Sequence, residues 1–89
     1  MEDKNKTNRL IEYRKRMRLT QKTVARLLGL KNASILSRYE SGSSLPTLER
    51  ALSLETIYRV PVAFLFPNLY EAIRSKIRDR EEKLPTRSL

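Results

Sequence analysis

Side chains that recognise another molecule by hydrogen bonding are concentrated between residues 32 and 38, in the stretch NASILSR. Arg38 carries a planar guanidinium that can make a bidentate contact with a pair of acceptors, such as O6 and N7 of guanine. A serine hydroxyl donates or accepts single hydrogen bonds and discriminates weakly, whereas an alanine methyl offers only an apolar contact. Five residues are therefore candidate base readers: Asn32, Ala33, Ser34, Ser37 and Arg38.

The composition argues against catalysis. The chain has no histidine and no cysteine, which removes the usual nucleophile and base pairs and the usual ligands of transition metals. Both of its glycines, Gly29 and Gly42, are expected at helix ends, so a glycine-rich phosphate loop is not predicted. We expect no enzymatic activity, no cofactor and no metal.

Charge predicts a polyanionic partner. Lys and Arg outnumber Asp and Glu by 19 to 10, for a net charge of +9. Residues 1–19 hold seven cations and three anions and residues 20–42 hold four and one, whereas residues 43–67 hold two of each. The excess thus coincides with the candidate base readers and the segment before them, which favours nucleic acid over a merely solvated basic surface.

The candidate base readers fall on the second of two short predicted helices. Thr20 is expected to cap the first helix, and Gly29 suits the left-handed conformation that ends it. Asn32 is expected to cap the second helix. Apolar residues at three- and four-residue spacing are expected to face a core: Val24, Leu27, Leu28, Ile35, Leu36 and Tyr39. Such a pair, polar and cationic outside, has the chemistry of a major-groove reader.

This stretch resembles the helix-turn-helix of the lambda-repressor and Cro-like (Xre-type) family. The shared marks are Leu19-Thr20-Gln21, Leu28-Gly29 and the run LSRYESG at residues 36–42, and the resemblance extends over roughly residues 10–66. It implies an all-α, five-helix domain that binds double-stranded DNA. One departure is an extra residue between Gly29 and Tyr39, which we assign to the turn at residues 30–32. Two registers therefore stay open for the first residues of the recognition helix.

The resemblance also implies roles for single residues. Gln21 corresponds to a family glutamine that contacts a DNA phosphate, and Ser43 lies in the loop that approaches the DNA backbone. Arg14 and Glu40 correspond to a shielded ion pair between the first and third helices. The cations around the motif are candidate phosphate contacts, first Lys22, Arg26 and Lys31 and then Arg9, Lys15 and Arg16.

The rest of the chain divides as follows. Residues 1–6 are predicted to be a flexible arm, and residues 7–67 the helix-turn-helix domain, with Thr7 capping a first helix that runs to about Met17. Thr47 is expected to cap a fourth helix to about residue 59, and Pro61 to start a short fifth helix that Pro67 stops. The expected core face of these last two helices contains Leu48, Ala51, Leu52, Leu54, Ile57, Tyr58, Phe64, Leu65 and Phe66.

Residues 68–84 predict an additional C-terminal helix, followed by a disordered tail at 85–89. Its apolar stripe is narrow and consists of Leu69, Ala72, Ile73 and Ile77. Two interpretations stay open. Either the first two turns pack on the domain, or the stripe is a dimer contact.

We therefore predict a sequence-specific binder of double-stranded DNA that acts as a cytoplasmic transcriptional repressor, works as a homodimer and has no membrane partner. An antitoxin of the same fold, whose main partner is a toxin protein, is the alternative. A nucleoid protein that binds DNA without sequence preference is a third reading. The defined polar set at residues 32–38 argues against it.

Overall fold

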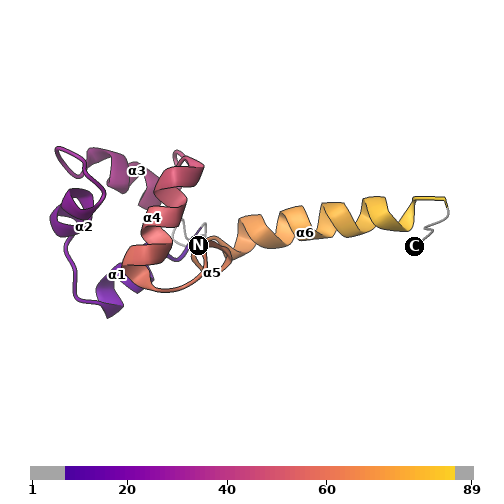
Figure 1. The fold of residues 1–89 in the computed structure, drawn as a ribbon, viewed down its shortest axis with the longest axis horizontal. Coiled ribbons are helices and arrows are strands. Elements are labelled where there is room, and N and C mark those ends of the chain that lie inside the picture. Colours follow the sequence, from indigo (N-terminus) through magenta and orange to yellow (C-terminus); the bar gives the residue numbers. More distant parts are fainter. Residues whose placement is uncertain (1–7, 86–89) are drawn as a thin grey trace, which may run out of the picture.

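A computed structural model describes residues 8–85 and contains six helices and no strand in that range. Five short helices form a body from which the sixth projects (Figure 1). The helices are α1 (Leu10–Arg16), α2 (Gln21–Leu27), α3 (Ser34–Ser41), α4 (Leu48–Tyr58), α5 (Val62–Leu65) and α6 (Pro67–Glu82). The predicted all-α architecture, five helices with an additional C-terminal helix, is confirmed.

Local capping determines where the helices begin and end. The hydroxyl of Thr20 accepts a hydrogen bond from the Thr23 amide at 3.0 Å, and Thr47 does the same for the Arg50 amide at 3.2 Å. Gly29 and Gly42 follow α2 and α3 with φ angles of 80° and 84°. A side chain is strained in that left-handed region, so glycine is favoured at both positions.

One hydrophobic core holds α1 to α5 together. Its buried members come from all five helices and their junctions: Leu10, Tyr13, Val24, Leu36, Tyr39, Leu54, Tyr58, Leu65 and Phe66. Leu28 and Ile35 are half-buried and pack against this cluster. The core therefore fixes the angle between α2 and α3 and leaves the opposite face of that pair in solvent.

The start of α1 is fixed by Asn8, whereas Thr7, the expected cap, lies outside the described residues. The Asn8 Oδ1 atom accepts a hydrogen bond from the Leu10 amide, and its Nδ2 atom donates to the Tyr39 carbonyl, both at 2.9 Å. The Arg9 amide also donates to the Leu65 carbonyl at 2.9 Å. These bonds join the first helix to the end of α3 and to α5.

Four residues expected in the core are exposed, and those predictions were wrong. Leu27 is 60% exposed, because α2 turns Val24 and Ala25 inward and rotates Leu27 toward solvent. In α4 the buried positions are Ala51, Leu54 and Tyr58, which leaves Leu48 and Leu52 off the packed face. In α5 only Leu65 is buried, and Phe64 is 53% exposed.

The C-terminal helix differs from its prediction at its start. Pro67 begins α6 rather than ending α5, since its missing N–H is unneeded in a first helical turn. None of the residues of α6 is buried, and the helix extends away from the body (Figure 1). Within the described part of the chain, no helix is long and apolar enough to cross a membrane. The arm at 1–6 and the tail beyond residue 85 lie outside the described residues.

Candidate nucleic-acid interface

The outer face of α3 is polar and exposed. Leu36, Tyr39 and Glu40 turn inward and are buried. Of the candidate base readers, Ser34, Ser37 and Arg38 lie on the exposed side of α3. Asn32 and Ala33 precede the helix in the turn, where Asn32 is exposed and Ala33 is half-buried. The Asn32 Oδ1 atom accepts a hydrogen bond from the Ser34 amide at 2.9 Å and so caps α3 from just outside it.

A cationic hollow of about 380 Å³ lies between α2 and the turn that leads into α3. Three predicted phosphate contacts line it, Lys22, Arg26 and Lys31, and so do two predicted base readers, Asn32 and Ala33. Ala25 and Leu30 complete the lining. The side chains of Lys22 and Arg26 share a face of α2 because they are four residues apart. The structure thus gathers three positive charges beside the N-terminal end of α3.

Ser43 lies beyond the opposite, C-terminal end of α3. Its amide donates to the Arg38 carbonyl at 3.0 Å, and its hydroxyl is 2.8 Å from the Ser41 hydroxyl. The first of these bonds satisfies the Arg38 carbonyl, which the end of the helix would otherwise leave without a partner. Ser43 therefore holds the end of the helix and keeps an exposed hydroxyl, at a site separate from the cationic hollow.

Arg14 and Glu40 form a shielded ion pair between α1 and α3. Arg14 Nε donates to Glu40 Oε2 at 2.7 Å and Nη2 donates to Oε1 at 3.2 Å, while Nη1 donates to the Leu19 carbonyl at 3.2 Å. The side chains are 13% and 3% exposed. The hydrogen bond that Arg14 donates to Glu40 raises the pKa of Arg14, which therefore stays charged.

Gln21 belongs to the same network. Its amide nitrogen donates to Glu40 Oε1 at 2.8 Å, so Glu40 joins α2 as well as α1 to α3. That nitrogen carries two hydrogens, so a bond to Glu40 leaves one for an acceptor outside the protein. The Glu40 carboxylate therefore orients Gln21, the residue at the start of α2 for which the sequence predicted a phosphate contact.

Tyr58 lies near this network without joining it. Its hydroxyl is buried and has no hydrogen-bond partner in the described part of the chain. Burial is the main cause that raises the pKa of the Tyr58 phenol, and the nearby negative charge of Glu40 adds to it. The phenol therefore stays neutral well above the pH at which an exposed tyrosine ionises.

Two arginines at the ends of α1, Arg9 just before it and Arg16 in its last turn, are engaged by residues of α1 itself. Arg9 and Arg16 bond Glu12 at 2.6 Å and 2.7 Å, and both guanidinium groups lie over the Tyr13 ring. The hydrogen bond from Arg9 lowers the pKa of Glu12. These two arginines are partly neutralised and contribute less to a basic surface than the cations around the hollow. Lys15 is exposed.

Two positioning residues were not found from the sequence. Arg50, in the first turn of α4, donates to the Tyr39 hydroxyl at 3.0 Å and so connects α4 with the end of α3. Asn8 supports the same end of α3 through the Tyr39 carbonyl. Asparagine is a common helix cap and Asn8 lies just before α1, so the sequence did carry a signal for its role at the start of this helix. Nothing local indicates the Arg50 contact.

The fold and this exposed helix pair define a helix-turn-helix protein. Residues 10–65 match the family model described as Helix-turn-helix, which covers more than half of the chain. The chain belongs to this family, in its Xre or lambda-repressor-like branch, and carries a DNA-binding regulatory domain. No curated protein and no solved structure matched the chain.

Proposed function

We propose that this protein binds double-stranded DNA at specific sequences and represses transcription, with α3 in the major groove. The observation that carries this proposal is the exposed polar face of α3 beside a hollow lined by three cations. In a helix-turn-helix the second helix enters the major groove and its first residues contact base edges. Occupying a promoter is enough for repression, so the proposal needs no catalytic step, cofactor or metal.

In this proposal the cations fix the domain on the DNA backbone. Lys22, Arg26 and Lys31 neutralise phosphates beside the N-terminal end of α3. Gln21 donates its second amide hydrogen to a phosphate, and Ser43 contacts the backbone from the far end of α3. Such contacts set orientation and affinity without carrying sequence information.

Base reading is assigned to the residues that face the groove. Arg38 makes a bidentate contact with a guanine. Asn32, Ser34 and Ser37 make weaker polar contacts, and Ala33 contacts a thymine methyl. Arg38 is in the second turn of α3, after Ser34 and Ser37. We therefore place the guanine contact away from the hollow, toward the C-terminal end of the helix.

The proposed active form is a homodimer on a two-fold symmetric site in the cytoplasm. One short helix reads only a few base pairs, and two copies are needed for useful discrimination against genomic DNA. The half-sites are then expected about one helical turn of DNA apart, or a multiple of it.

An antitoxin that holds a toxin protein is the second candidate. The observation in its favour is α6, which exposes Leu69, Tyr70, Ile73 and Ile77 to solvent. Purification of the protein from its own cells separates the two functions. A stoichiometric second chain favours the antitoxin, whereas its absence favours the repressor.

Selection of bound fragments from a random DNA pool tests DNA reading directly. We expect a short two-fold symmetric consensus, and competition by random DNA that is weaker by orders of magnitude. Equal competition by random and selected DNA would contradict sequence-specific binding and favour a nucleoid protein. The pool also shows the half-site spacing.

A further inference from the structure

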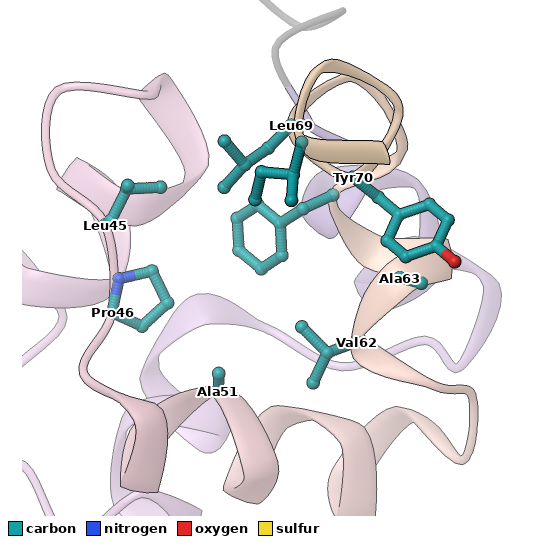
Figure 2. Close-up of a pocket in the computed structure, with 9 residues that line it drawn as sticks. Leu45, Pro46, Ala51, Val62, Ala63, Leu69 and Tyr70 are labelled. Atoms are coloured by element: carbon teal, nitrogen blue, oxygen red, sulfur yellow. The ribbon is translucent and has the colours of Figure 1, made fainter. Parts of the chain in front are cut away.

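An apolar groove lies on the side of the body where α6 begins. It has a volume of about 330 Å³ and is lined almost entirely by carbon. Figure 2 shows Leu45 and Pro46 on one side, Leu69 and Tyr70 on the other, and Val62 at the base. Leu45 is 63% exposed. Contiguous apolar surface of this kind marks an interaction site.

The apolar side of α6 continues outward from this groove with the spacing of a coiled-coil seam. Starting at Tyr70, steps of three and four residues alternate through Ile73, Ile77 and Arg80, and the next step reaches Leu84, two residues beyond the end of α6. Tyr70, Ile73 and Ile77 are 48%, 50% and 45% exposed. A helix of this length with no buried residue is marginal on its own in water, so its seam needs a partner.

We infer that the partner is a second copy of this chain, whose α6 lies antiparallel along the seam. The groove is at the N-terminal end of α6, so a partner helix covers both seam and groove only if its C-terminal end reaches the groove. A two-fold axis then repeats the contact, and each copy supplies one helix and one groove. This inference rests on the homodimer of the proposed function and names its interface, and it does not depend on DNA binding.

The heptad spacing fixes the register of this pair. With Ile73 opposite Ile77 of the second copy, Leu84 of the second copy reaches Phe66 in the groove. Arg80, the polar member of the seam, then faces the ring of Tyr70 across the interface. A guanidinium over a tyrosine face is a favourable cation–π contact, which gives Arg80 a role in an otherwise apolar seam.

The charges of α6 favour the antiparallel orientation. Its first turn contains no acidic residue, whereas Glu81 and Glu82 end it, where its own dipole disfavours them. In an antiparallel pair these carboxylates lie beside the positive N-terminal end of the partner helix. A parallel pair would bring Arg80 against Arg80. Arg74 and Lys76 each approach their own counterpart near the axis, at exposed edges where screening keeps the repulsion small.

Sedimentation velocity across a dilution series of the full chain tests the interface. We expect a dimer for the wild type, a monomer for Ile77→Glu, and a dimer for the control Ser75→Glu on the opposite side of α6. Thermal unfolding of all three should show an intact body, because α6 contributes no buried residue. A wild type that is monomeric throughout, or equal effects of the two substitutions, would overturn the inference.

The orientation is tested by crosslinking, since the chain has no cysteine. A short thiol-specific crosslinker should join two copies of Lys76→Cys, which meet near the axis. It should fail with Leu84→Cys, because antiparallel helices hold the two positions 84 on the order of 25 Å apart at 1.5 Å per residue. The reverse pattern would rule out the antiparallel pair. Both tests omit DNA, so their failure is distinct from a failure of DNA binding.

Discussion

Arg14 of α1 and Glu40 of α3, 26 positions apart in sequence, are joined by two hydrogen bonds of 2.7 Å and 3.2 Å. Glu40 also accepts the Gln21 amide at 2.8 Å, so one carboxylate connects the first three helices. The carboxylate is almost fully shielded from water. A shielded charge of this kind is costly once its partner is removed.

Arg14→Ala should therefore destabilise the fold by about 3 kcal/mol, because the buried Glu40 charge is left with only the Gln21 amide. Glu40→Ala should cost less, since the Arg14 side chain reaches solvent more easily. The measurement is the midpoint of urea unfolding. Lys15→Ala, an exposed cation on the same helix, is the control. Equal midpoints for all three variants would contradict the shielded pair.

Tyr58→Phe should be neutral or stabilising by up to about 1 kcal/mol at neutral pH, because it removes a buried hydroxyl that has no partner in the described chain. The raised pKa of Tyr58 also predicts a loss of stability in alkali. Above about pH 10 the unfolded phenol ionises while the folded phenol stays protonated, so the unfolded state is favoured.

Thermal unfolding of wild type and Tyr58→Phe from neutral pH to above pH 10 measures both effects. The wild type should lose stability more steeply than the variant in the alkaline range. Parallel curves would show that the Tyr58 phenol ionises alike in both states. A marked destabilisation of the variant at neutral pH would indicate a hydrogen bond that the described residues do not supply.

Arg38→Ala should relax the preference at one position of the DNA half-site and cost about 1–3 kcal/mol of binding free energy there. The reason is that a bidentate guanine contact discriminates one base pair. Affinities for a panel of single-base operator variants provide the measurement. If Arg38→Ala weakens every variant by the same factor, Arg38 contacts a phosphate, and specificity falls to Ser34, Ser37 and Ala33.

Lys22→Ala, Arg26→Ala and Lys31→Ala should each weaken binding to all sequences alike and reduce the salt dependence of the affinity by about one unit of slope. Each side chain lines the cationic hollow, and each lost phosphate contact releases one counterion fewer. Filter binding at several salt concentrations measures the slope. Arg78→Ala on exposed α6 is the control and should leave it unchanged. An unchanged slope for the three hollow variants would place the phosphates elsewhere.

Local signals in the sequence determined most of the fold. Thr20, Thr47 and the two glycines placed helix ends correctly, because capping depends on a few neighbouring residues. The order of those signals with LSRYESG was enough to identify the helix-turn-helix family. The polar set on α3 was also readable, since helical periodicity alone separates it from Leu36 and Tyr39.

Tertiary structure decided what periodicity leaves open. Leu27, Leu48 and Phe64 are apolar and correctly spaced, yet exposed, because burial depends on whether another helix covers that face. The bond of Gln21 to Glu40 and that of Arg50 to Tyr39 join residues distant in sequence, and no local pattern encodes them. The sequence alone therefore determined the helices and the chemistry of their faces. Packing alone decided which apolar faces were buried and left α6 with an uncovered seam.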